Sequence, residues 1–298
     1  ECKSRIGEEI LKILKDLTKK VKTNVSSLET NEKVLAEIDF HFAKARYAVK
    51  IKAVEPQLAE KPMIKFTEMI HPLLIGNASE IVSNDFSIGE GYRGLIITGS
   101  NTGGKTVTLK TVGLLVLMMK AGLFVTAADA VIYPYEHVLA DIGDSQNILQ
   151  SLSTFSGHLK KIIEMLNESD EKTLCLIDEI CAGTDPQEGA ILAETILNAM
   201  SNKGITTVIT THFGELKTLE FSNEYFKNAS VEFDKETLKP TYKLLIGIPG
   251  ISNTLLIAQN LGIDSEIIKQ AKNILGSRRS HSAVIIERLS ETQQKLDS

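Results

Sequence analysis

Apolar positions recur along this chain with two different periods, and the change of period divides it. Up to residue 54 they follow three- and four-residue steps, beginning with Ile6, Ile10 and Ile13. This spacing predicts one or two long helices with charged outer faces. A bundled pair of helices and an extended helical arm fit the pattern equally well.

Beyond residue 94, short apolar runs alternate with stretches of helical spacing. Strands are predicted at 95–98, 173–178 and 206–211, and helices at 105–121 and 189–200. Alternating strands and helices are typical of an α/β core built around a parallel sheet. The predicted fold class is therefore α/β.

The remaining stretches are less regular. Residues 56–92 hold many Pro and Gly residues with room for short strands, and 230–233 with 241–245 resemble a hairpin. Two more helices are predicted at 252–261 and 264–275. We expect a helical segment over 1–54, an α/β domain over 55–276 and a polar helical extension or tail over 277–298.

The composition excludes several classes of protein. With 298 residues, 43% apolar and 24% charged, the chain is neither disordered nor collagen-like, nor a small disulfide scaffold. Its formal net charge of −5 excludes an overall polycation, so any contact with nucleic acid must come from a local patch. Because aromatic residues make up only 5% and Trp is absent, a base-stacking platform for single strands is disfavoured.

Cysteine usage and the absence of targeting patterns indicate a cytoplasmic location. Cys2, Cys175 and Cys181 form no CxxC pair, which argues against a disulfide framework and a zinc site. No apolar run reaches the roughly 20 residues that a membrane span needs, and no signal-peptide pattern opens the chain. Since the chain begins without Met, we expect a fragment that starts inside an element.

The strongest chemical pattern lies between the first strand of the α/β region and its helix. Residues 99–106 match G-x-x-x-x-G-K-[ST], a loop whose backbone N–H groups wrap phosphates. Lys105 would reach the β- and γ-phosphates, and Thr106 would place its hydroxyl on Mg²⁺. The predicted nucleotide-binding residues here are Gly99, Ser100, Asn101, Thr102, Gly103, Gly104, Lys105, Thr106 and Thr108.

Two acids end the strand predicted at 173–178. Asp178 can hold Mg²⁺ through water, and Glu179 can polarise the attacking water as a general base. Acidic pairs at strand ends also occur in plain surface turns. The phosphate-binding loop upstream favours the catalytic interpretation.

Three further polar residues are candidates. His212 follows the third predicted strand, where it could hydrogen-bond the γ-phosphate and sense hydrolysis. A lone histidine is more often structural, but the two preceding motifs favour a function. Ser153 and Thr154 stand at a predicted helix start, where hydroxyls either cap the helix or aim its N-terminus at a phosphate.

Together these stretches resemble the ATPase domain of the MutS family. The resemblance rests on TGSNTGGKT, ADIGDSQNILQSLSTFSGH, LIDEICAGTDPQEGA and TTHFGELK, and it covers residues 5–276. VLAEIDFHFAKARYA, NASVEFD and PTYKLLIGIPGISN are similar to the second, endonuclease-type branch of the family. That branch is linked to suppressing recombination and to rescuing collided ribosomes.

The resemblance implies an ABC-type P-loop ATPase domain, with a mixed or parallel sheet flanked by helices, preceded by an all-α lever segment. It implies ATP and Mg²⁺ as cofactors and a homodimer with two composite sites. Ser153 and Thr154 of one subunit would contact the nucleotide of the other, and residues 183–185 would cross the interface. The dimer would clamp branched or mismatched DNA, or a collided ribosome, through parts largely outside this chain.

Further roles follow only from the resemblance. Ile81 and Val82 match the place where the family sandwiches adenine. Asn101 would help shape the loop around the phosphates, and Asp144 and Gln146 fall in the stretch that links the site to the rest of the molecule.

Some features depart from the family's pattern. Ser100 stands where Pro is usual, Cys181 where Gly is usual and Thr254 where Ala is common, and none of these removes a catalytic group. Nothing after Leu275 resembles the small nuclease domain of the second branch. We therefore expect no strand cutting from this chain by itself.

Other functions remain open. A module that uses ATP only as a dimerisation ligand would not need Glu179. Another ABC-type ATPase, such as a chromosome-maintenance protein, would share the loop, and a transporter motor would show an LSGGQ-like stretch in place of residues 152–155. A phosphate-transferring kinase would need neither Glu179 beside Asp178 nor His212.

Overall fold

In the computed structural model the chain divides into two compact units, Glu1–Lys50 and Ile51–Ser298. The structure describes residues 2–76, 81–99, 103–143, 151–234, 237, 239–250 and 254–278. Within these ranges, no helix combines the length and the apolar character that crossing a membrane would require.

The first unit consists of two helices, α1 (Cys2–Lys22) and α2 (Val25–Lys50), joined by a two-residue turn. The spacing of apolar residues predicted one or two long helices, and two are present. None of their described residues is buried, and Ile10 and Leu17 are 50% and 51% exposed. The apolar stripe therefore lies open on the helix surface.

A six-stranded sheet forms the centre of the second unit. Its strand order is β10-β9-β4-β8-β7-β6, and every neighbouring pair is parallel except β10 with β9. The strands are β4 (Gly94–Thr98), β6 (His137–Asp141), β7 (Thr173–Ile177), β8 (Thr206–Thr211), β9 (Phe226–Phe233) and β10 (Pro240–Ile246). Strands β4, β7 and β8 are buried along their whole length. The first and second read as nearly continuous apolar runs, whereas β8 buries four threonines among its six residues.

A second, four-stranded sheet has the order β1-β5-β2-β3. Its strands are β1 (Gln57–Leu58), β2 (Ile64–Met69), β3 (Asn84–Ile88) and β5 (Asp129–Ile132), and a short turn, η1 (Pro72–Leu74), follows β2. Short strands were expected within residues 56–92. Their pairing with β5 was not, because that strand arrives from a later part of the chain.

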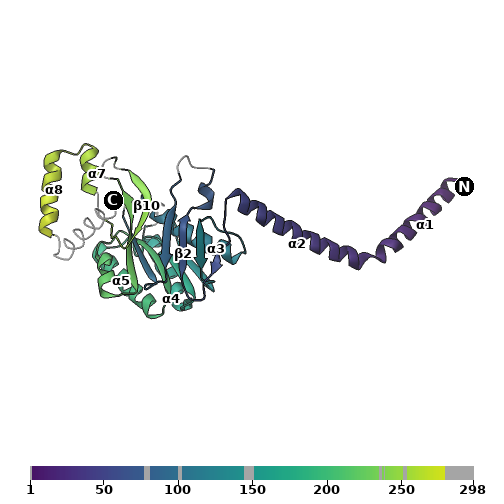
Figure 1. The fold of residues 1–298 in the computed structure, drawn as a ribbon, viewed down its shortest axis with the longest axis horizontal. Helices are drawn as coiled ribbons and strands as arrows, with labels where there is room; N and C mark the ends of the chain where they lie inside the picture. The colour runs from purple at the N-terminus through teal and green to yellow at the C-terminus, as the bar shows by residue number, and fades with distance from the viewer. Residues whose placement is uncertain are drawn as a thin grey trace. The chain divides into compact units, whose positions relative to one another are not determined.

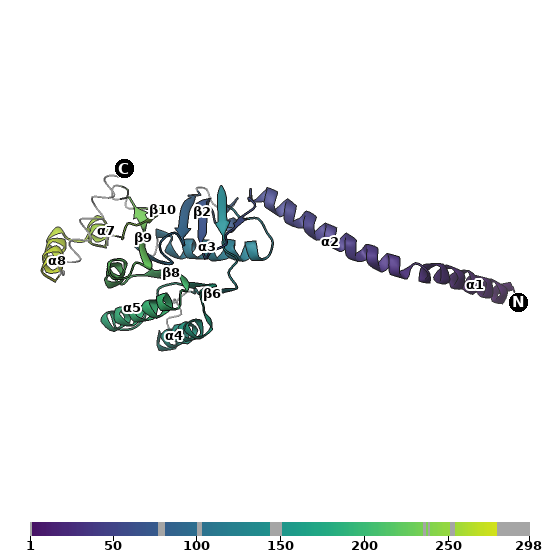
Figure 2. The same ribbon diagram turned by 60° about the horizontal axis from the view of Figure 1, so that its bottom comes forward.

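Helices cover both faces of the central sheet. Helix α3 (Lys105–Lys120) packs on the face of Leu95, whereas α4 (Ser151–Glu168) and α5 (Pro186–Asn202) pack on the face of Ile96 (Figures 1 and 2). Neighbouring residues of a strand point to opposite faces, so the strand supplies both cores. The predicted α/β fold with a flanked mixed sheet is confirmed.

The remaining helices are short or lie late in the chain. They are η3 (Glu215–Thr218), α6 (Leu219–Ser222), α7 (Thr254–Asn260) and α8 (Ser265–Arg278). Helix α5 begins three residues earlier than its apolar spacing predicted. The Asp185 side chain accepts hydrogen bonds from the N–H groups of Gln187 and Glu188, and Pro186 occupies the first helical position.

Candidate functional site

Two glycines with positive φ angles flank the loop between β4 and α3. Gly99 and Gly104 have φ angles of 130° and 96°, which side chains with a Cβ rarely adopt. The Nζ of Lys105 donates a 2.5 Å hydrogen bond to the carbonyl oxygen of Gly99. Three predicted loop residues, Ser100, Asn101 and Thr102, lie outside the described residues.

The ammonium group of Lys105 is buried close to two carboxylates. Lys105 as a whole is only 1% exposed. Burial lowers the pKa of Lys105 from 10.5 to about 8, although the carboxylates of Glu179 and Asp178 act in the opposite direction. A polyanion such as a triphosphate would oppose this effect by stabilising the charged form.

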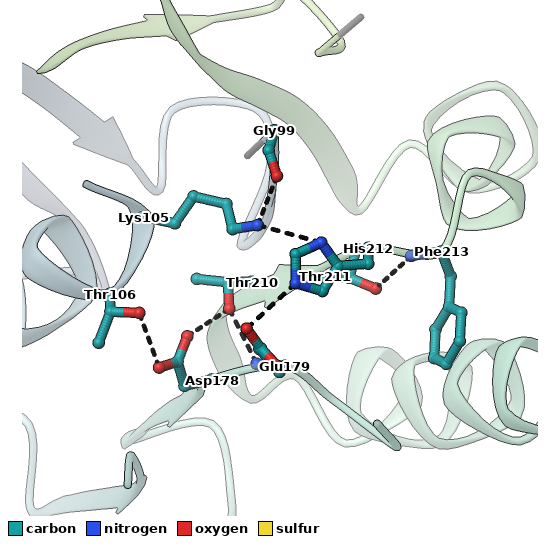
Figure 3. A network of polar contacts seen from close by, with 9 residues as sticks. All are labelled: Gly99, Lys105, Thr106, Asp178, Glu179, Thr210, Thr211, His212 and Phe213. Carbon is teal, nitrogen blue, oxygen red and sulfur yellow. Dashed lines mark hydrogen bonds and ion pairs between the residues drawn. The ribbon is translucent and has the colours of Figure 1, made fainter. Parts of the chain in front are cut away.

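Asp178 receives hydrogen bonds from two different elements. Thr106 Oγ1, in the first turn of α3, donates to Oδ2 at 2.9 Å, and Thr210 Oγ1, in β8, donates to Oδ1 at 2.5 Å (Figure 3). The carboxyl ends of the parallel strands β4, β7 and β8 meet at one edge of the sheet, which brings these residues together.

Glu179 is held by its backbone and by its side chain. Its φ of 51° is unusual for a residue other than glycine, and its N–H donates to Thr210 Oγ1 at 2.8 Å. Its Oε1 lies 3.1 Å from His212 Nε2. Cys181 also has a left-handed φ of 54°, which gives a physical reason why glycine would suit this position.

His212 lies between the lysine and the general-base candidate. Its Nδ1 is 3.5 Å from Lys105 Nζ, and its Nε2 faces Glu179 (Figure 3). A charged lysine can only donate, so Nδ1 is the acceptor in the first of these contacts. This chain of contacts could sense whether a phosphate occupies the site.

The oxygens of Thr106 and Asp178 fit a magnesium ion. Mg²⁺ takes oxygen ligands, and in nucleotide sites it binds through one or two protein groups plus phosphates and waters. A hydroxyl and a carboxylate at the loop meet that description, and among the described residues no larger cluster of His, Cys, Asp or Glu could hold a metal by itself.

An exposed aromatic ring that the sequence did not single out lies beside the loop. A Cβ atom on Gly104 would be 3.3 Å from Cδ1 of Tyr242, which is 51% exposed. Tyr242 lies at an irregularity of β10 with a φ of 62°. Asn84 fixes this irregularity, because its Nδ2 donates to Tyr242 O at 2.9 Å and its Oδ1 accepts from Leu244 N at 2.6 Å.

The structure says less about the other predicted site residues. Ile81 and Val82 are partly exposed and precede Asn84, whereas Thr108 is buried one turn into α3. Ser153 and Thr154 lie in the first turn of α4. Asp144 and Gln146 lie outside the described residues.

Thr210 and Asp141 complete the site, and sequence reasoning missed both. Thr210 contacts both acids, and the Asp141 carbonyl accepts the N–H of Asp178 at 2.9 Å. The available signal was their position, since each is a polar residue at or next to the carboxyl end of a strand.

Comparison with known proteins agrees with the resemblance. The family model for MutS domain V matches residues 95–278. The chain is 48% identical to "Endonuclease MutS2" of Shouchella clausii over 299 residues and 46% identical to that of Geobacillus sp. over 298 residues, in both cases 100% of this chain and 38% of the relative. A Listeria monocytogenes protein of the same name is 45% identical over 285 residues, 95% of this chain and 36% of its own length. The chain thus spans less than two-fifths of these relatives.

Proposed function

This chain belongs to the MutS family, and from that premise we propose that it binds ATP with Mg²⁺ and hydrolyses it. One observation carries the proposal. The loop lysine, His212 and the two acids form a single set of contacts at one edge of the sheet, in which Thr210 joins the two acids (Figure 3). MutS domain V is an ATPase domain, and these are the groups that such chemistry requires.

Each residue has a distinct role in this proposal. The Lys105 ammonium binds the terminal phosphates, and Thr106 and Asp178 hold the ion. When bound, Mg²⁺ neutralises charge that develops on the phosphate oxygens. Glu179 takes a proton from the attacking water, and His212 orients its carboxylate through the 3.1 Å contact.

The adenine base would lie against Tyr242. The exposed ring stands beside the last glycine of the loop, and Asn84 ties it to the segment that carries Ile81 and Val82. The side chains of Tyr242, Ile81 and Val82 support the adenine-binding site that the family resemblance implies.

The wider function is an ATP-driven dimeric clamp acting on DNA. Ser153 and Thr154 would reach the nucleotide of a second subunit, and residues 183–185 would cross between the subunits. The relatives are named "Endonuclease MutS2", which supports a nucleic-acid target. Branched or mismatched DNA is the first candidate, and a collided ribosome is the second.

The deciding experiment is the ATPase rate per subunit against protein concentration, for wild type and Glu179→Gln. A rate that rises with concentration and is lost in Glu179→Gln supports a hydrolysing dimer. Glu171→Gln is the matched control, because Glu171 is an exposed acid before β7, at the opposite end of that strand. Turnover in Glu179→Gln would exclude it as the base. No turnover in wild type would leave ATP as a dimerisation ligand only.

A further inference from the structure

The buried carboxylate of Asp141, at the end of β6, binds two side chains of helix α4. Asp141 is 1% exposed, its Oδ2 lies 2.6 Å from His158 Nδ1, and its Oδ1 accepts from Lys161 Nζ at 2.9 Å. His158 and Lys161 lie three residues apart on α4 and therefore share one face of that helix.

The same residue also contacts the magnesium-site candidate. The carbonyl oxygen of Asp141 accepts the backbone N–H of Asp178 at 2.9 Å, and the carboxylate of Asp178 is bonded to Thr106 and Thr210. One residue thus joins α4 to the acid at the end of β7.

The rest of the contact between α4 and the sheet is less directional. Ile162 and Met165 are buried in the core beneath the helix. Apolar burial is roughly proportional to area and sets no unique position along the helix axis. Hydrogen bonds to an ionised group have a defined geometry and are stronger.

We propose that Asp141 is a positioning residue: it holds the first turn of α4, with Ser153 and Thr154, where that turn can reach a nucleotide bound by a second subunit. This rests on the dimeric ATPase proposed above. Asp141 does not touch the substrate, and its effect is exerted on the site across the interface.

The first test compares Lys161→Met with Lys160→Met. Lys161 is half-exposed, so its replacement leaves the core intact, and the neighbouring Lys160 is an exposed lysine on the same helix. We expect Lys161→Met to lower kcat about ten-fold with the ATP Kd of dilute protein within about three-fold of wild type. Asp141→Asn should act in the same direction. Equal losses in Lys160→Met, or an unchanged kcat in Lys161→Met, would overturn the proposal.

The second test mixes subunits. Lys161→Met keeps its own loop and acids, and Glu179→Gln keeps an unaltered α4. In a mixed dimer, the Lys161→Met subunit receives a correct α4 from its neighbour, so a 1:1 mixture should recover about a quarter of the wild-type rate. No recovery would mean that Asp141 acts only within its own subunit, which refutes the proposal. A wild-type rate independent of concentration would instead refute the dimeric site itself.

Discussion

The hydroxyl of Thr210 donates a 2.5 Å hydrogen bond to Oδ1 of Asp178. It simultaneously accepts the backbone N–H of Glu179 at 2.8 Å. A single side chain on β8 therefore fixes both acids at the end of β7. The contact holds the carboxylate of Asp178 and the backbone of Glu179.

Two replacements of Thr210 should show whether its hydroxyl, rather than the volume of its side chain, is needed for activity. Thr210→Val keeps the shape but leaves two part-buried polar groups without this partner, at a cost of about 1 kcal/mol. We expect kcat to fall about ten-fold or more in Thr210→Val, and to stay within about three-fold in Thr210→Ser, which keeps the hydroxyl. Steady-state ATPase assays and thermal unfolding of both variants would check this. Equal activity in the two variants would contradict the role of the hydroxyl.

The lowered pKa of Lys105 predicts a pH dependence of ATP binding. Phosphates favour the charged ammonium, and the pKa of Lys105 in the free protein is about 8. Below this pH the lysine is already charged, whereas above it the protein must take up a proton on binding, so affinity falls as pH rises. Calorimetry at pH 7 and 8.5 in two buffers of different ionisation enthalpy would measure the uptake. Lys105→Arg stays charged at both pH values, and the same uptake there would refute the assignment.

Replacing Tyr242 should weaken the binding of the base and leave the binding of the phosphates unchanged. Stacking of a base on an aromatic ring contributes about 1–3 kcal/mol, so Tyr242→Ala should weaken ATP binding about five-fold or more. Tyr242→Phe should bind nearly as wild type. Inorganic triphosphate lacks a base, and its affinity should be equal in all three proteins. Phe221→Ala removes another exposed aromatic, and a similar loss in that variant would argue against a specific contact.

Asp185 should contribute to stability as the N-cap of α5. Its side chain accepts from Gln187 N at 2.9 Å and Glu188 N at 3.0 Å. Asp185→Ala should lower the free energy of unfolding by about 0.5–2 kcal/mol, whereas Asp185→Ser, a good cap, should lose less. Urea unfolding of the three proteins measures the difference. An Asp185→Ala variant as stable as wild type would mean that the cap is dispensable.

The strand ends were the most predictable part of the site. Strand β7 is a nearly continuous apolar run, so the acids that follow Ile177 mark where it leaves the core. Strand β8 gives a weaker mark, because four of its own six residues are threonines. Helix starts were less predictable, because caps act through side chains that carry no apolar spacing. The apolar spacing placed the start of α5 at residue 189, whereas the helix begins three residues earlier, at Pro186.

The sequence by itself determined the chemistry at the loop: the spacing of Gly99, Gly104 and Lys105 requires only local backbone conformation and a strand on one side. It also determined the α/β class, since period and burial follow from neighbouring residues. Only the tertiary structure decided which distant residues meet. Asn84 binds the backbone of Tyr242, 158 residues away, and His158 and Lys161 bind Asp141. Such contacts depend on strand order and helix placement, which are set by the packing of the whole core and leave no periodic trace in the chain.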